Sequence, residues 1–246
     1  MSPSTETSES REFASELKFV VPATRAAAIR DWARDRLAAD PNGSGEAGDT
    51  YLTTSLYFDT EQFDVYRRNG SFKRSKYRVR RYGSGPILFL ERKLKTKNLV
   101  SKRRSTVDLS ELPRLSDDKA FRDWGGFWFQ RRLLARGLHP VCQISYERTA
   151  RVMMTPNGPI RFTLDRDVRA APVDKAEFQP LIDSELVTSA CILEIKYRHA
   201  MPALFKQMVV KFGLSPQPVS KYRLAIETLQ LAHEQHRKSA KAVVYA

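Results

Sequence analysis

The chain has 246 residues, 41% of them hydrophobic, which is enough to bury a substantial core in one large domain or two small ones. Its 42 Lys and Arg against 28 Asp and Glu give a formal net charge of +14, which predicts a polyanionic partner or a strongly anionic substrate, or else a basic solvated surface. Two cysteines and four histidines exclude a disulfide framework and a Cys/His zinc site. A reducing compartment is the simpler assumption.

The N-terminal segment, residues 1–11, is rich in Ser, Thr and Glu and lacks the apolar stretch of a signal peptide or membrane anchor. We therefore expect a disordered tail over residues 1–12, one domain over residues 13–238 and a C-terminal tail over residues 239–246. The expected location is cytoplasmic.

The first predicted element is a strand over residues 15–21, where side chains alternate in character. A helix with Thr24 as its N-cap is predicted next. The apolar stripe of this helix has helical spacing and comprises Ile29, Trp32, Ala33 and Leu37. Asp40 and Pro41 end the predicted helix.

Further strands are predicted over residues 51–58, 76–82, 87–93, 105–109, 141–154, 160–165 and 192–197. The turn-rich segment 83–86 predicts an antiparallel hairpin between the two strands beside it. Helices are predicted over residues 117–136, 202–212 and 221–237. The expected class is α+β, with more strand than helix.

The predicted strands carry charge on one face. A period of two places Lys76, Arg78 and Arg80 together, while Tyr77 and Val79 face the other way. The same rule groups charged side chains on the other strands, namely Glu91 with Lys93, Arg161 with Asp165, and Glu194 with Lys196.

Two arrangements explain these charged faces. The common one is a half-buried sheet whose polar face meets water. The other follows if helices cover the apolar faces, because the charged faces then look at one another inside an antiparallel β barrel or tunnel with the helices packed outside. A lumen rich in Arg and Lys needs counter-ions, which phosphate supplies and a divalent cation bridges to carboxylates. We favour the tunnel.

Short motifs in a fixed order carry a family resemblance. They are Glu16-Leu17-Lys18-Phe19, Ser55-Leu56-Tyr57-Phe58-Asp59, Lys76-Tyr77-Arg78-Val79-Arg80, Glu91-Arg92-Lys93, Ser101-Lys102-Arg103, Tyr146-Glu147-Arg148-Thr149-Ala150, Leu193-Glu194-Ile195-Lys196 and Ser220-Lys221-Tyr222. From about residue 13 to residue 227 the chain resembles VTC domains, the polyphosphate polymerase domains of the triphosphate tunnel (CYTH-like) superfamily. Ala14 stands where the wider superfamily has a first-strand glutamate, which favours the VTC branch over the triphosphatases.

The resemblance implies roles for individual residues. Those expected to bind substrate phosphates are Lys18, Arg78, Arg80, Lys93, Lys102, Arg103, Arg148, Arg161, Lys196, Ser220 and Lys221. Those expected to be catalytic are Arg78, Arg80, Lys93 and Lys221. Glu194 is the implied ligand of Mn²⁺ or Mg²⁺, with Glu16 and Asp165 as weaker candidates.

Purely structural roles remain open for two of these residues. Glu194 has an alternative role in a salt bridge with Lys196 or a cross-strand arginine. Ser220 has an alternative role as a helix N-cap.

The implied activity is metal-dependent transfer of the γ-phosphate of ATP to a growing inorganic polyphosphate chain, with positioning and charge stabilisation as the main catalytic effects. Alternatives are a triphosphatase or nucleoside triphosphate hydrolase of the same fold, and a non-catalytic sensor of polyphosphate or inositol pyrophosphate. Nucleic-acid binding, suggested by the basic and aromatic run over residues 72–77, is disfavoured because Tyr77 alternates away from the arginines. The sequence shows no membrane span and leaves a membrane partner and the oligomeric state undetermined.

Overall fold

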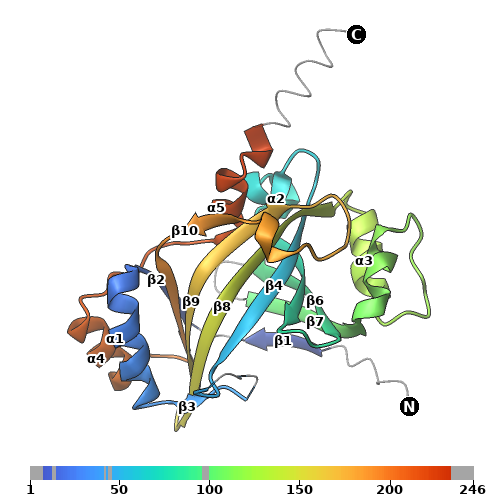
Figure 1. The fold of residues 1–246 in the computed structure, drawn as a ribbon. Helices are drawn as coiled ribbons and strands as arrows, with labels where there is room; N and C mark the ends of the chain where they lie inside the picture. The colour runs from blue at the N-terminus through green and yellow to red at the C-terminus, as the bar shows by residue number, and fades with distance from the viewer. Residues whose placement is uncertain (1–7, 13–14, 42, 44–45, 96–99, 234–246) are drawn as a thin grey trace.

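The computed structural model describes residues 8–12, 15–41, 43, 46–95 and 100–233, and Figure 1 shows its fold. The strands are β1 (Ser8–Glu12), β2 (Ser15–Val21), β3 (Ala38–Ala39), β4 (Thr50–Asp59), β5 (Ser75–Tyr82), β6 (Ile87–Lys95), β7 (Val100–Asp108), β8 (His139–Thr155), β9 (Gly158–Pro172), β10 (Glu185–Thr188) and β11 (Cys191–Tyr197). The helices are α1 (Ala23–Arg34), α2 (Asp64–Arg67), α3 (Phe127–Leu134), α4 (Ala203–Lys211) and α5 (Lys221–Thr228), with 3₁₀ turns η1 (Gly70–Phe72), η2 (Leu109–Ser116) and η3 (Leu181–Asp183). Ala14, residues 1–7 and residues 234–246 lie outside the described residues.

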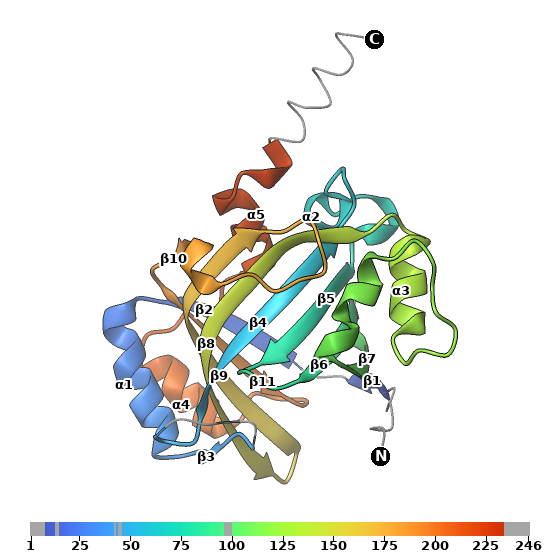
Figure 2. The same cartoon turned by 45° about the vertical axis from the view of Figure 1, so that its right-hand side comes forward.

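The strands form one antiparallel sheet in the order β1-β7-β6-β5-β4-β8-β9-β11-β2, with β10 beside β9 and β3 beside β8. The sheet curls back on itself, as the two views in Figures 1 and 2 show. Its end strands β1 and β2 are consecutive in the chain, and three peptide units limit the separation of the Glu12 and Ser15 Cα atoms to about 11 Å. The predicted antiparallel tunnel is confirmed, although pairing among the described residues does not close it strictly.

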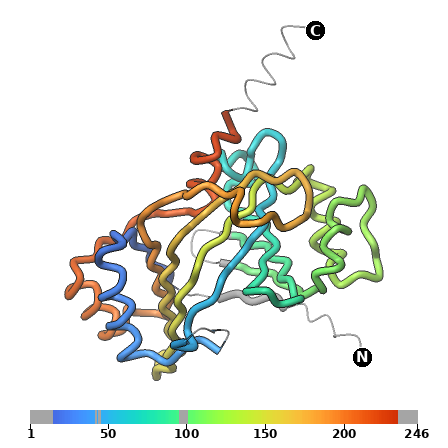
Figure 3. The backbone as a smooth tube through the Cα atoms, viewed as in Figure 1, coloured from blue at the N-terminus to red at the C-terminus, as the bar shows by residue number. Residues whose placement is uncertain are grey.

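The helices cover the outer face of the sheet. Helices α1 and α4 lie together on one side, and α3 lies on the other (Figure 3). Ile29 of α1 and Phe205 of α4 share one core with Phe19 of β2 and Leu193 of β11. A second core joins β4 to β8 with α3 and α5. The strands therefore place their apolar side chains outward, under helices, and their charged side chains inward.

The hairpin predicted at residues 83–86 is confirmed, since β5 pairs with β6 in antiparallel register from Ser75↔Leu94 to Arg81↔Leu88. None of the helices in the described part of the chain is long and apolar enough to span a membrane.

Four predicted helix boundaries are wrong. Helix α1 begins after Pro22, whose carbonyl accepts the first turn's N–H groups, so Thr24 is not the N-cap. It ends at Arg34 rather than at Asp40, and Ala38 and Ala39 form strand β3 instead. The helix predicted over residues 117–136 is only α3, because Gly126 begins it and the preceding segment forms turns. Helix α5 ends at Thr228, before Gln230 adopts a positive φ of 53°.

The tail expected over residues 1–12 contains strand β1, which differs from the disorder predicted for residues 8–12. Strand β1 pairs with β7 from Ser8↔Arg104 to Glu12↔Val100. The sequence of β1 has no apolar alternation to reveal a strand. Its pairing satisfies backbone groups along β7 that would otherwise be a free sheet edge.

Asp59 at the end of β4 connects the sheet to two helices. Its carboxylate is fully buried and accepts backbone hydrogen bonds from Thr60 (2.8 Å), Val65 (2.8 Å) and Tyr66 (2.9 Å). It also accepts a hydrogen bond from the hydroxyl of Tyr222 on α5. Burial raises the pKa of Asp59 above its usual range, against the lowering effect of these hydrogen bonds.

Asp59→Ala should lower the free energy of unfolding by about 3 kcal/mol or more, because it leaves buried donors without an acceptor. Urea unfolding followed by circular dichroism measures this change. Asp183→Ala, at an exposed position in η3, is the control and should change stability by less than about 0.5 kcal/mol. Equal effects of the two substitutions would contradict the role of Asp59.

Candidate functional site: a basic tunnel

Side chains of Lys76, Arg78 and Arg80 on β5 point into the lumen, as their period-two spacing predicted. Arg80 is buried and donates to the hydroxyls of Ser55 (3.1 Å) and Tyr146 (2.9 Å). On the opposite face of the strand, Tyr77 and Val79 belong to the outer core.

Glu91 on β6 is the first of four carboxylates that hold these cations. It accepts hydrogen bonds from Arg78 Nε and Arg104 Nε, each at 2.7 Å, and Lys102 Nζ lies 2.6 Å away. Burial opposes its charge, but Arg78, Arg80, Lys102 and Arg104 hold the pKa of Glu91 well below its usual range. The group is therefore a carboxylate at neutral pH.

Asp165 and Glu194 form a second centre on β9 and β11. Arg148 bonds both oxygens of Asp165, at 2.7 and 2.8 Å. Lys221 lies 2.5 Å from Asp165 and 3.5 Å from Glu194, and Lys18 lies 3.0 Å from Glu194. Burial opposes the charge of both carboxylates, yet Arg148, Lys221 and Lys18 keep both pKa values low.

Glu16 on β2 joins the two sides of the tunnel. Its carboxylate lies 3.3 Å from Lys18, 3.2 Å from Lys93 and 3.6 Å from Lys196. Lys93 belongs to β6, which does not pair with β2, so this ion pair joins two separate parts of the curled sheet. Burial opposes ionisation, but Lys196, Lys93 and Lys18 lower the pKa of Glu16 to about 2.

The N-terminus of α5 enters the tunnel. The Ser220 hydroxyl caps the helix by accepting a hydrogen bond from the Arg223 N–H. The alternative role of Ser220 as a helix N-cap is therefore confirmed. The same hydroxyl accepts Lys76 Nζ at 2.8 Å. One oxygen thus serves both the helix end and the lumen.

The lumen carries more cations than anions. The cations are Lys18, Lys76, Arg78, Arg80, Lys93, Lys102, Arg104, Arg148, Lys196 and Lys221, and the carboxylates are Glu16, Glu91, Asp165 and Glu194. Lys76 and Arg80 contact no carboxylate in the part of the chain that the structure describes. Burial and the charges of Lys18, Lys93 and Arg78 lower the pKa of Lys76 to about 7.

One expected phosphate ligand lies elsewhere. Arg103 points outward and stacks on Trp128, with its guanidinium carbon 4.4 Å from the ring centre, so its expected place in the lumen is wrong. Arg104, its neighbour, takes the inward position. Arg161 shares the strand face of Asp165 and pairs across from Lys196, where Asp40 (2.9 Å) and the Tyr51 hydroxyl (3.1 Å) hold it.

Lumenal residues that were not named as site residues from the sequence include Lys76, Glu91, Arg104 and Tyr146. Period-two alternation already placed Lys76 and Glu91 on charged faces, and that signal was sufficient to find them. Nothing local distinguishes Arg104 from Arg103.

The carboxylates fit a divalent cation that arrives with phosphate ligands. The described residues contain no group of three or more His, Cys, Asp and Glu placed to hold a metal. Glu194 is ionised, as metal ligation requires, but it is shared between Lys18 and Lys221. Mg²⁺ is typically held by one or two carboxylates together with substrate phosphates and water. Glu194, with Glu16 and Asp165 nearby, fits that kind of site.

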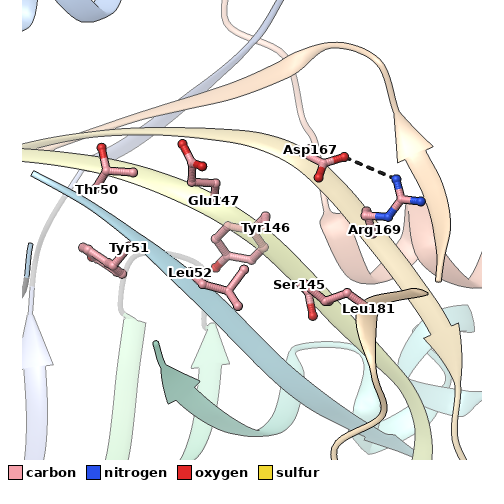
Figure 4. A pocket seen from close by; sticks show the side chains of 9 residues that line it. All are labelled: Thr50, Tyr51, Leu52, Ser145, Tyr146, Glu147, Asp167, Arg169 and Leu181. Atoms are coloured by element: carbon pink, nitrogen blue, oxygen red, sulfur yellow. Dashed lines mark hydrogen bonds and ion pairs between the residues drawn. The ribbon is translucent and has the colours of Figure 1, made fainter. Parts of the chain in front are cut away.

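A pocket lies beside Leu52 and Leu181, where β4, β8 and β9 are neighbours (Figure 4). The ion pair between Asp167 and Arg169, at 3.5 Å, forms part of its wall. Glu147 in this wall binds the exposed Arg166 rather than a lumenal group. The pocket includes none of the lumenal cations.

A model of the VTC domain matches residues 13–230 of the chain. The chain belongs to the VTC domain family. No curated protein matches this VTC domain chain.

Solved structures with a similar fold include HpAC1 from Hippeastrum, a putative adenylyl cyclase described as having a dominant triphosphatase activity. It is 16% identical, with 87% of this chain and 95% of that chain covered and a TM-score of 0.53. A putative adenylate cyclase from Bacillus halodurans is 15% identical, with coverages of 85% and 95% and a TM-score of 0.52. At these identities the likeness shows the fold of the VTC domain.

Lys76→Met should stabilise the protein near pH 6 and do so less near pH 10. The pKa of Lys76 is about 7 in the folded chain and near 10.5 when unfolded, so unfolding takes up a proton between these values. The contribution of Lys76 to stability is therefore fully present above about pH 10.5 and is lost as the pH falls through about 7.

Urea unfolding of both proteins at the two pH values measures this difference. Lys206→Met, at an exposed position on α4, is the matched control and should show no pH-dependent difference. A Lys76→Met effect independent of pH would contradict the shifted pKa.

Proposed function

We propose that the tunnel binds the triphosphate of ATP or another nucleoside triphosphate, together with inorganic polyphosphate, and transfers the γ-phosphoryl group to the polyphosphate chain. The observation that carries this proposal is the excess of lumenal cations, with Lys76 and Arg80 free of carboxylate contacts among the described residues. Burying cations without counter-ions costs free energy, so binding an anion that acts as their counter-ion is favourable.

The arrangement of the cations suits a chain of phosphates. Lys76, Arg78 and Arg80 follow one strand face with Cα atoms about 6.6 Å apart. Arginine offers a planar pair of donors to phosphate oxygens, and lysine offers a point charge. Lys93 lies beside Lys76 on the neighbouring strand β6, and Lys18, Lys196 and Lys221 come from β2, β11 and α5.

In the proposed reaction Arg78 and Arg80 orient the transferred phosphoryl group, and Lys93 and Lys221 stabilise charge on its oxygens. Arg148, held by both oxygens of Asp165, stays in place during the reaction. Mn²⁺ or Mg²⁺ bound at Glu194 would neutralise charge that develops on the phosphates. The attacking oxygen comes from the terminal phosphate of the chain and needs no side-chain nucleophile. It forms the new P–O bond as the bond between the β- and γ-phosphates breaks, and the nucleoside diphosphate leaves.

A second candidate is hydrolysis of triphosphate or of a nucleoside triphosphate in the same tunnel. It is supported by the fold likeness to the Hippeastrum protein, for which a triphosphatase activity is described. The same cations would bind the substrate, and water would replace phosphate as the attacking group. The nature of the acceptor distinguishes the two reactions.

Tripolyphosphate should raise the melting temperature, because a ligand at about 100 times its dissociation constant adds about 2.7 kcal/mol to the stability of the folded state. The rise should shrink as salt is added. Arg80→Ala should weaken binding by about 2 kcal/mol or more, roughly 30-fold, because it removes a desolvated partner of the phosphate.

Differential scanning fluorimetry and titration calorimetry measure these two effects. Arg103→Ala is the matched control, since this arginine points away from the lumen, and it should bind tripolyphosphate like the unmodified protein. No shift at millimolar tripolyphosphate in low salt would contradict a phosphate tunnel.

Glu194→Gln should abolish polyphosphate synthesis from ATP and Mn²⁺ while leaving tripolyphosphate binding largely intact. Glu194 is proposed to act on charge that develops in the transition state, whereas ground-state binding depends on the cations. Products are resolved on a gel that separates polyphosphate, pyrophosphate and orthophosphate.

Glu147→Gln is the control, because Glu147 pairs with Arg166 outside the lumen, and synthesis should persist. Wild-type synthesis by Glu194→Gln at limiting Mn²⁺ would refute the metal role. Orthophosphate as the sole product of the unmodified protein would favour the hydrolase. Binding without any product would favour a polyphosphate or inositol pyrophosphate sensor.

A further inference from the structure

One end of the charged tunnel carries a partly exposed apolar group. At the end of the lumen beside the β5–β6 turn lie Tyr51, Tyr82, Ile87 and Phe89, which we name the mouth patch. The ring centres of Tyr51 and Tyr82 are 5.5 Å apart, and those of Tyr82 and Phe89 are 5.3 Å apart. Ile87 shares the strand face of Phe89 and is 37% exposed, while Tyr82 and Phe89 are half-buried and Tyr51 is buried.

The mouth patch is continuous with the phosphate-binding part of the lumen. Arg80 lies 5.8 Å from the centre of the Tyr82 ring, and Arg104 lies 4.5 Å from that of Phe89. Arg80 also reaches the Tyr146 hydroxyl deeper in the tunnel. The aromatic rings and the cations therefore belong to one surface.

The order of side chains along β5 matches the order of parts in a nucleotide. Tyr82 is followed inward by Arg80, Arg78 and Lys76, so the Cα atoms of Tyr82 and Arg78 are about 13 Å apart. A nucleoside triphosphate likewise carries a flat aromatic base at one end and phosphates at the other. A polyphosphate chain alone has no group that would use an apolar surface.

We propose that the mouth patch is a nucleobase subsite, in which the base of a nucleoside triphosphate stacks on Tyr82 beside Phe89 while its phosphates extend inward along Arg80 and Arg78. This inference rests on the proposed phosphate-binding function and adds the position and orientation of the donor nucleotide. Aromatic rings and arginine planes stack on any base, because every base has a π-face. The subsite thus favours a nucleotide over an inorganic triphosphate without selecting one base.

The test compares the affinities of ATP and inorganic tripolyphosphate by titration calorimetry on the whole chain. Tyr82→Ala should weaken ATP binding about tenfold, the change produced by about 1.4 kcal/mol of lost stacking. Tripolyphosphate binding should change less than twofold in the same protein. Tyr82→Phe, which keeps the ring, should retain the ATP affinity.

Phe121→Ala removes an aromatic ring that is 40% exposed and packs beside Arg114 rather than in the lumen, and it should change neither affinity. Unchanged ATP binding in Tyr82→Ala would overturn the subsite. The subsite would also be overturned if ATP and tripolyphosphate lost affinity equally in Tyr82→Ala and again in Tyr82→Leu, which keeps apolar volume. Tripolyphosphate binding by the unmodified protein separates these failures from failure of the phosphate tunnel itself, in which neither ligand would bind.

Discussion

Repulsion between cations inside a curled sheet is the constraint on which this structure depends. Each of four lumenal carboxylates reduces this repulsion by contacting more than one cation. Glu91 contacts three, Glu16 contacts three, and Asp165 and Glu194 share Lys221. The compensation is incomplete, because cations still outnumber carboxylates. The remaining positive charge is what makes the lumen a place for polyanions.

The rest of the fold follows from keeping those charges together. Strands that turn their charged side chains inward must bury the opposite faces, and the helices on the outside do this. Glu16 and Lys93 join two separate parts of the curled sheet at 3.2 Å. Asp59 holds α5 through Tyr222, so the adjacent Lys221 enters the tunnel at a defined position.

The lumen is graded along its length. Lys76 and Ser220 lie where α5 enters, the arginines and carboxylates follow, and aromatic rings lie beside the β5–β6 turn. Hydrogen bonds from Arg80 to Ser55 and Tyr146 keep it between the charged and aromatic parts. A surface with cations along its length and aromatic rings at one end suits a ligand that joins phosphates to an aromatic group.

The sequence by itself determined the strand faces and the family. Period-two alternation placed Arg78 and Arg80 opposite Tyr77, because neighbouring side chains in any strand point to opposite sides. Whether Arg103 or Arg104 faces inward was decided by tertiary structure, since β7 has little apolar alternation and a shift of one residue reverses its faces. The grouping of Tyr51, Tyr82 and Phe89, like the contact of Glu16 with Lys93, arises from strand pairing and from the curl of the sheet. These depend on contacts summed over the whole chain, which no local pattern contains.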